Sequence, residues 1–270
     1  MDKEKKKLQK VILSIAVEIK QICERHSIPY FINSGTQLGA VRHRGFIPWD
    51  DDFDIGMKRK DYEKFLEICD KELDKGKYFL QTESSEPYYA FSFAKIQLKN
   101  TKIVEDFSKN VPISHGIFVD IFPYDNLPDN LFIRKVFLAQ NYFLKSMLWV
   151  KCGYGEELQK KKKIYKIIKA LSRFISKENL KCMRRKFIQK YNLVETRQCF
   201  SSDYPKEQLM NVWFDSLVDY KFGDEVFKGF EKFDEYLTHL YGNYMELPPV
   251  EQRITHTNVK VEYGPYENVF

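Results

Sequence analysis

The sequence lacks the cysteine pattern of a disulfide-stapled or zinc-stabilised domain. Its cysteines are odd in number, scattered, and never spaced as C-x-x-C; they are Cys23, Cys69, Cys152, Cys182 and Cys199. Disulfide frameworks and zinc ribbons show even numbers or paired spacings. We therefore expect five plain thiols. A chain of 270 residues with 43% apolar side chains can bury a core without staples.

A long apolar run is also missing. The most apolar stretch, Leu131 to Val150, contains Arg134, Lys135 and Lys145, whereas a spanning helix needs about 20 mostly apolar residues. The N-terminus starts with the charged segment MDKEKKK and continues into an amphipathic pattern, without the apolar core and cleavage site of a signal peptide. These patterns predict a cytoplasmic protein without a transmembrane helix.

Several enzyme signatures do not occur: the P-loop, the dinucleotide-binding G-x-G-x-x-G, the zinc motif H-E-x-x-H and the nucleophile elbow G-x-S-x-G. Aromatic residues are plentiful, at 16% of the chain. Disordered chains are poor in aromatic residues, so the chain is expected to fold over most of its length.

Hydrophobic periodicity predicts mixed α/β structure in the first half and mainly helices after Asn130, including residues 225–241. We expect an α+β fold with a mixed-sheet core over 1–128 and a helical elaboration over 129–270, whose C-terminal tail returns to the core. The predicted elements of the first half are helices over 4–26, 37–43 and around 62–69, and strands over 28–33, 53–57, 78–81, 91–98, 103–105 and 116–122.

Positive charge is concentrated in residues 160–190, which hold thirteen Lys and Arg and a single acid, Glu178. The overall charge is +6, so the rest of the chain is net negative. Apolar residues from Ile164 to Ile175 recur at helical spacing among these lysines. Three interpretations remain open: a solvated helix face packed on the core, a surface for anionic lipid, or a nucleic-acid contact.

Four carboxylates stand close together in the segment Trp49 to Gly56, which reads WDDDFDIG. In a strand, the side chains of Asp52 and Asp54 would point to the same face and could converge on a divalent ion. Oxygen ligands of this kind suit Mg²⁺ or Mn²⁺. A solvated acidic turn is the alternative; an EF-hand loop is disfavoured because Ile55 occupies its glycine position.

A third carboxylate, Asp120, lies in the apolar segment 118–122, where a charge is costly without a positive partner. It is either part of the same site or a member of a structural ion pair, and Asp125 is a weaker candidate. The turn Gly35-Thr36 at a predicted helix start could hold a phosphate through backbone N–H groups. Together these parts predict a metal-assisted site for a nucleotide phosphate.

Residues 35–56, GTQLGAVRHRGFIPWDDDFDIG, resemble the signature of the LicD family, the phosphocholine transferases related to fukutin. Further matches are Lys95 with Thr101, Asp120 in VDIFP, and the segment 241–249 with His256. The matches run from about residue 26 to 257. Ser34 and Asn243 depart from the residues that the family often has at these positions.

The resemblance implies a nucleotidyltransferase-like fold and transfer of a phospho-alcohol, with phosphocholine as the best expectation, from a CDP-linked donor to a sugar hydroxyl. The acceptor would be a cell-surface polysaccharide, teichoic acid or lipopolysaccharide precursor, and CMP would leave. Asp52 and Asp54 match the family's metal-binding pair, Asp120 a third, catalytic carboxylate, and Gly35-Thr36 the phosphate-side turn.

Further residues are candidates for binding the donor. Arg42, His43 and Lys95 could contact phosphate oxygens. An aromatic cage for choline could be formed by Tyr88, Tyr89, Phe91 and Phe93. The possible substrate-binding residues are Trp49, Asp51, Tyr88, Tyr89, Arg253 and His256.

Two rival functions remain open, a nucleotidyltransferase acting on RNA or a small molecule, and a non-catalytic membrane-associated scaffold. The family's acceptors are lipid-linked, which favours peripheral attachment to the anionic inner face of the cytoplasmic membrane through residues 160–190. On this interpretation no nucleic acid is bound.

Overall fold

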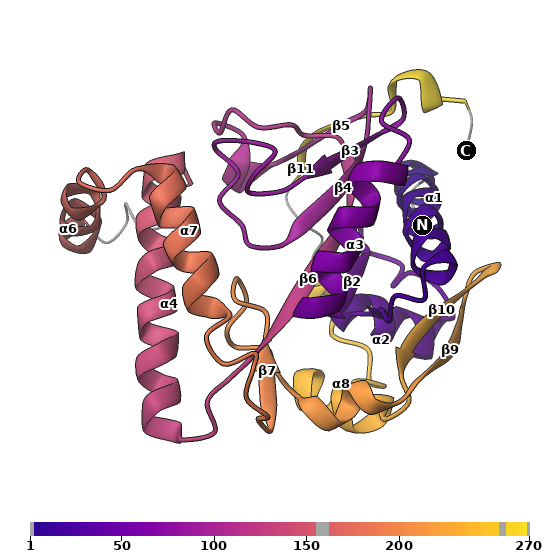
Figure 1. The fold of residues 1–270 in the computed structure, drawn as a ribbon. Helices are drawn as coiled ribbons and strands as arrows, with labels where there is room; N and C mark the ends of the chain where they lie inside the picture. The colour runs from indigo at the N-terminus through magenta and orange to yellow at the C-terminus, as the bar shows by residue number, and fades with distance from the viewer. Residues whose placement is uncertain (1–2, 155–161, 254–257, 269–270) are drawn as a thin grey trace.

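A curled mixed sheet forms the centre of the structure, a computed structural model that describes residues 3–154, 162–253 and 258–268 (Figure 1). Its strand order is β1-β2-β6-β4-β3, and β7 pairs with the end of β6 and with β8. The α+β class expected from the sequence is confirmed. The strands are β1 (Phe31–Ile32), β2 (Asp54–Lys58), β3 (Tyr78–Gln81), β4 (Ala94–Leu98), β6 (Ile117–Asn126), β7 (Gln198–Phe200) and β8 (Gln208–Met210).

Two helices cover one face of this sheet, α1 (Lys3–Arg25) and α3 (Arg59–Glu72). Both were predicted, because their apolar residues recur at helical spacing and these residues are buried. Alternation along β6 sends Ile117, Val119 and Ile121 into the core with α1. The side chains between them, Phe118 and Asp120, therefore face the other side, where the functional site lies.

The pairing of β6 with its neighbours brings charged residues of three strands side by side. Asp54 at the start of β2 is paired in parallel with Asp120 of β6. On the other side of β6, Lys95 of β4 is paired antiparallel with the same Asp120. These registers place two carboxylates and one ammonium across adjacent strands, where Cβ atoms of paired residues are about 5 Å apart.

The C-terminal part contains more strand than the sequence predicts. The prediction of a helix over 225–241 is wrong for its first third: β9 (Leu217–Phe222) and β10 (Glu225–Phe230) form a hairpin, and α8 begins at Phe233 and ends at Tyr241. The loop between the strands is Gly223-Asp224, with Gly223 at φ 64°, and such two-residue loops are a hairpin signal. Phe222 and Phe227 of this hairpin are buried in the core.

The division between residues 128 and 129 stays a prediction. The structure does show strands from the second part pairing with strands from the first: β7 pairs with β6, and β11 (Asn258–Glu262) pairs with β5 (Lys102–Glu105). Tyr263, just after β11, is buried in the core. The described residues 258–263 therefore contact the first part of the chain.

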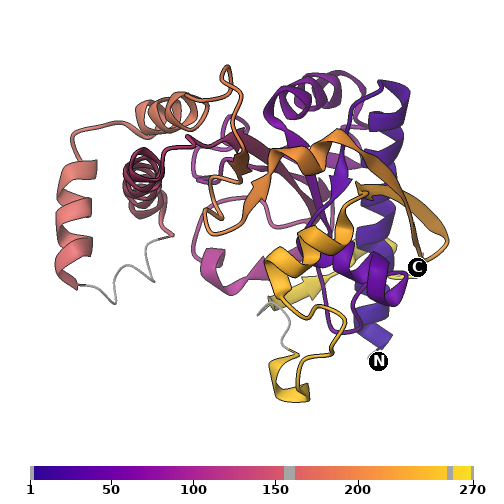
Figure 2. The same cartoon turned by 90° about the horizontal axis from the view of Figure 1, so that it is seen from below.

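Three helices form a helical arm at one edge of the molecule: α4 (Leu131–Cys152), α6 (Lys162–Ser172) and α7 (Lys177–Ile188). Both α6 and α7 pack on α4, and Figures 1 and 2 show α6 farthest from the sheet. The basic segment is therefore two helices, the second beginning after the N-cap Ser176. None of the described helices is long and apolar enough to cross a membrane. All five cysteines are free thiols, as predicted.

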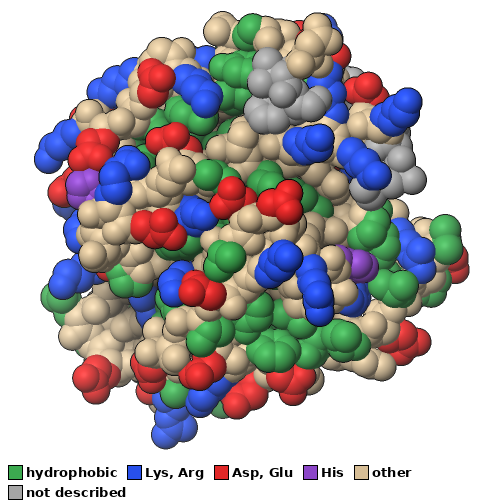
Figure 3. All heavy atoms as spheres, turned by 90° about the vertical axis from the view of Figure 1, so that its right-hand side faces the viewer, with side chains coloured by type: hydrophobic (Ala, Val, Ile, Leu, Met, Phe, Trp, Pro, Cys, Tyr) green, Lys and Arg blue, Asp and Glu red, His purple; other side chains and the backbone are tan. Residues whose placement is uncertain are grey.

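Among the described residues, the side of the molecule opposite α6 has no concentration of positive charge like that of the basic segment. On the face shown in Figure 3, acidic and basic side chains are interspersed around small apolar areas, with no extended region of one sign.

Candidate active site

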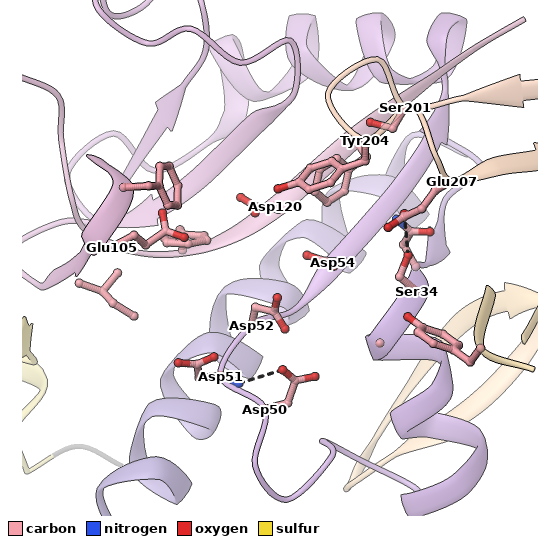
Figure 4. A pocket seen from close by; sticks show the side chains of 17 residues that line it. Ser34, Asp50, Asp51, Asp52, Asp54, Glu105, Asp120, Ser201, Tyr204 and Glu207 are labelled. Atoms are coloured by element: carbon pink, nitrogen blue, oxygen red, sulfur yellow. Dashed lines mark hydrogen bonds between the residues drawn. The ribbon is translucent and has the colours of Figure 1, made fainter. Parts of the chain in front are cut away.

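A pocket of about 300 Å³ opens on the face of the sheet opposite α1 and α3. Seven of its lining residues are carboxylates and five are aromatic, and none of the described residues that line it is Lys, Arg or His. The full set is Asn33, Ser34, Gly35, Asp50, Asp51, Asp52, Asp54, Ile103, Glu105, Phe107, Phe118, Asp120, Phe122, Ser201, Tyr204, Glu207 and Tyr241 (Figure 4).

The predicted catalytic carboxylates Asp52, Asp54 and Asp120 all line this pocket. The strand begins later than predicted, at Asp54, so Asp52 belongs to the loop before β2 and not to the strand itself. The start of the strand is fixed by Thr36, whose Oγ1 accepts a hydrogen bond from the Asp54 backbone N–H at 2.9 Å. Thr36 therefore positions Asp54, and its side chain does not line the pocket.

Like charges crowd this part of the pocket. Burial raises the pKa of Asp54 well above its usual value, and the carboxylates of Asp52 and Asp120 raise it further. A cation would relieve this repulsion, because it stabilises the ionised form of every carboxylate near it.

Lys95 is the positive partner expected for the carboxylate of Asp120 in its apolar strand. Its Nζ lies 3.0 Å from Asp120 Oδ1 and 3.5 Å from Glu105 Oε2. Burial alone would lower the pKa of Lys95, but Asp120 and Glu105 outweigh burial and raise it. Lys95 therefore stays charged, held behind the pocket wall between two acids.

The donor set fits a hard divalent cation that keeps water or substrate oxygens in its coordination sphere. No group of three His, Cys, Asp or Glu side chains in the described ranges is already arranged to hold a metal ion. Mg²⁺ is commonly bound by one or two carboxylates, completed by water and substrate phosphates. Asp54 with Asp52 or Asp120 meets that requirement.

The N-terminus of α2 (Ser34–His43) reaches the pocket through Asn33, Ser34 and Gly35. Tyr236 holds this end: its hydroxyl accepts from the Ser34 N–H at 2.7 Å and donates to Asn33 Oδ1 at 2.8 Å. A Cβ on Gly35 would lie 3.3 Å from Asp50 Oδ2, so glycine keeps this approach open. Helix N-termini favour phosphate groups, and phosphate binding at the Gly35-Thr36 turn stays a prediction.

The structure does not bring Arg42 and His43 to the pocket. They lie at the other end of α2, where Arg42 Nη1 donates to Tyr244 O at 2.6 Å and Arg42 Nε donates to His43 Nε2 at 3.0 Å. Burial lowers the pKa of His43, and Arg42 lowers it further.

Trp49 and Arg253 lie together outside the pocket lining, with the Arg253 guanidinium 4.9 Å from the Trp49 ring centroid. Asp51 does line the pocket. His256, another predicted substrate residue, lies outside the described residues.

The aromatic residues predicted to form a choline cage pack elsewhere. Tyr89, Phe91 and Phe93 are buried against one another in the core, and Tyr88 lies under the ammonium of Lys177 at 3.5 Å. None of the four lines the pocket.

Several pocket residues were missed by sequence analysis. One signal was available: Phe118 and Phe122 alternate with Asp120 along β6, which puts all three on one face. Tyr204, Glu207 and Tyr241 come from distant segments that the pattern of a single sequence does not join. Burial raises the pKa of Tyr204 well above its usual value, and Asp120 and Asp54 raise it further, so its hydroxyl stays protonated.

Comparison with known proteins identifies the family of the chain. A family model described as LicD/FKTN/FKRP, nucleotidyltransferase domain, matches residues 27–148. The lipopolysaccharide cholinephosphotransferase LicD of Haemophilus influenzae is 30% identical over 92% of this chain and 94% of its own length. The chain belongs to the LicD family. An uncharacterised protein of Rickettsia typhi is 43% identical over 65 residues, 24% of this chain and 20% of its own.

The LicD domain match contains Asp52, Asp54 and Asp120. It ends before Tyr204, Glu207 and Tyr241, so the described pocket joins the matched LicD domain to segments that follow it.

Proposed function

We propose that this LicD-family protein transfers phosphocholine from CDP-choline to a sugar hydroxyl of a lipopolysaccharide precursor or a related surface glycan, and releases CMP. The observation that carries the proposal is the pocket itself, where Asp52, Asp54 and Asp120 converge next to a helix N-terminus. The similarity to a lipopolysaccharide cholinephosphotransferase over nearly the whole chain supports the cargo and the acceptor.

A divalent cation held by Asp54 with Asp52 or Asp120 would supply the positive charge that binds the diphosphate and stabilises departing CMP. The acceptor oxygen attacks the phosphorus that carries choline, a new P–O bond forms, and the bond from that phosphorus to the oxygen of CMP breaks. Asp120 accepts the proton of the attacking hydroxyl, since the adjacent Lys95 favours its ionised form. The N-terminus of α2 orients the phosphates through its N–H groups.

The test is transfer by the purified protein with Mg²⁺, a lipopolysaccharide acceptor and, in turn, CDP-choline, CDP-ethanolamine, CDP-glycerol and CDP-ribitol. We expect CMP and phosphocholine-modified acceptor with CDP-choline. Asp54→Asn should lower the rate by about 100-fold or more, because it removes a carboxylate proposed to hold the cation that stabilises the departing CMP.

Asp219→Asn is the matched control, because Asp219 lies on β9 in an exposed pair with Lys228; its rate should equal that of the wild type. Turnover of a nucleoside triphosphate without CMP release from any CDP-alcohol would overturn the proposal in favour of a nucleotidyltransferase. Full activity in Asp54→Asn would overturn the assignment of the site.

We also propose that α6 attaches the protein to the anionic inner face of the cytoplasmic membrane, where lipid-linked acceptors are built. One side of α6 packs on the core through Ile168, but other apolar residues are exposed: Ile167 is 60% exposed, and Phe174, just beyond the helix, is 87% exposed. Ile164 and Leu171 share their spacing and are exposed as well. Exposed Lys163, Lys166, Lys169 and Arg173 lie between them, a charge pattern complementary to anionic lipid.

A further inference from the structure

The pocket has two unlike ends on either side of Asp54 and Asp120 (Figure 4). Ser34 and Glu207 lie at one end, and Glu105 lies at the other. We propose that the second end, called here the aromatic end and formed by Ile103, Glu105, Phe107 and Phe118, is the subsite for the alcohol group of the donor and selects a quaternary ammonium ion. The inference rests on the proposed function and adds the residues that choose the cargo.

Two strands and a short turn build the aromatic end. Ile103 and Glu105 come from β5, and Phe107 follows in the turn Asp106–Ser108. Phe118 comes from β6, two residues before Asp120. The ammonium of Lys95 links the parts, since it lies 3.2 Å from the Phe118 ring centroid and 3.5 Å from Glu105 Oε2. Phe118 and Asp120 are thus successive residues on the same face of β6, so the aromatic end borders the carboxylates proposed to hold the cation.

The chemistry of these side chains distinguishes the competing cargoes. The four side chains of the aromatic end are two phenyl rings, one aliphatic chain and one carboxylate. None of the four is an amide, a hydroxyl, Lys, Arg or His. A glycerol or ribitol chain needs several hydrogen-bond partners, and a primary ammonium presents three N–H donors. A quaternary ammonium has no donor and binds by cation–π contact and charge. The aromatic end therefore matches choline better than the other alcohols.

Charge at this end favours a cation as well. Glu105 and Asp120 both contact the ammonium of Lys95, and the four side chains of the aromatic end include one carboxylate and no cation. Lys95 also lies against the Phe118 ring, whereas Phe107 is 45% exposed. Phe107 is accordingly the ring that we expect to contribute most to a bound ammonium.

Buried aromatic residues that were expected to form a choline cage lie behind Phe107 and support its ring. Phe107 packs on Phe91 with ring centroids 5.9 Å apart and on Tyr154 at 6.4 Å. Phe91 in turn packs on Phe93 at 4.9 Å. This layer fixes the position of Phe107 without occupying the pocket, which is the preorganisation that a selective subsite needs.

The experiment compares CDP-choline with CDP-3,3-dimethylbutanol, its neutral isostere in which carbon replaces the ammonium nitrogen. CMP release is measured for the wild type, Phe107→Leu and Glu105→Gln. Leucine keeps an apolar surface and removes the π face, so the preference for CDP-choline in kcat/KM should fall about fivefold, mainly through KM. Glu105→Gln should lower the same preference. Phe143→Leu, a control on α4 with 42% exposure, should leave it unchanged.

The outcomes separate the two proposals. No CMP release from any CDP-alcohol by the wild type would overturn the proposed function. Release from CDP-choline, with equal losses for both donors in Phe107→Leu and in Glu105→Gln, would leave the function standing and overturn the aromatic end as the selective subsite. Thermal unfolding of each variant shows that it is folded, and if Phe107→Leu is not, Glu105→Gln alone decides.

Discussion

Among single residues, the buried carboxylate of Asp203 determines how the segment carrying Tyr204 is held. Its Oδ1 accepts from Arg184 Nη2 at 2.8 Å, and its Oδ2 accepts from the Ser92 N–H at 2.7 Å. Asp203→Asn would leave Arg184 and Lys145 without their counter-charge in the interior. We expect the free energy of unfolding to fall by about 3–5 kcal/mol in chemical denaturation, and Asp219→Asn to change it by less than about 1 kcal/mol.

The pKa of Asp203 predicts how the stability of the protein depends on pH. Burial alone would raise the pKa of Asp203, but Arg184 and Lys145 outweigh burial, so the pKa in the folded state is lowered. Its contribution to stability is therefore complete at neutral pH and is lost as the pH falls below about 4, the usual value for an aspartate. The stability difference between wild type and Asp203→Asn should shrink below that pH. A difference that stays constant from pH 7 to 3 would contradict this assignment.

The predicted site residues that the structure brings into one pocket are those that local patterns identify. Asp52 and Asp54 stand in one short segment, and Asp120 interrupts an apolar strand, so each could be found without knowing its neighbours. Arg42 and His43 are close to the same motif in sequence, but α2 carries them about 1.5 Å per residue away from its pocket end. Glu207 and Tyr241 depend on tertiary contacts that no local pattern encodes.

At the scale of elements, β2 depends on Gly56. Gly56 is paired with Phe31 of β1, and a Cβ at this position would lie 2.1 Å from Phe31 Cζ. Phe31 is itself packed against Phe214 and Phe230, with centroids 5.2 and 4.2 Å away, so the ring has little room to move. Gly56→Ala should therefore lower the free energy of unfolding by about 1–3 kcal/mol.

The control for this prediction is Gly45→Ala, where the nearest atom to an added Cβ is at an ordinary 3.7 Å. Thermal unfolding of the two variants should show a clear loss for Gly56→Ala and a small change for Gly45→Ala. Because β2 begins at Asp54, we also expect Gly56→Ala to lower CMP release. Equal unfolding temperatures for the two variants would contradict the close approach of Phe31.

Most elements of the first half were predictable because their hydrophobic periods are clear. The stripe of α1 and the strand Tyr78–Gln81 fold as the patterns indicate. Residues 225–230 were misassigned because the alternation in β10 is short and runs directly into α8. The signal that would have corrected the prediction is the Gly223-Asp224 turn.

At the scale of the whole molecule, the surface proposed to bind anionic lipid lies on α6, which contributes no residue to the described lining of the pocket. Changing Lys166, Lys169 and Arg173 to Glu should lower binding to anionic liposomes at least tenfold in flotation, because each basic residue near such a surface contributes about 1 kcal/mol. The matched control reverses Lys60, Lys64 and Lys71 on α3 and should bind as the wild type does. Equal binding of both triple variants, or no binding by the wild type, would refute membrane attachment by α6.

We expect the pocket to bind its donor as a metal complex, since seven carboxylates and no described basic residue line it. The most direct test is the affinity for CDP-choline by isothermal titration calorimetry, with Mg²⁺ and with EDTA, in wild type and Asp54→Asn. We predict that binding needs Mg²⁺ and weakens by about 100-fold without it or in the variant. Equal affinity with and without the metal, unchanged by Asp54→Asn, would contradict it.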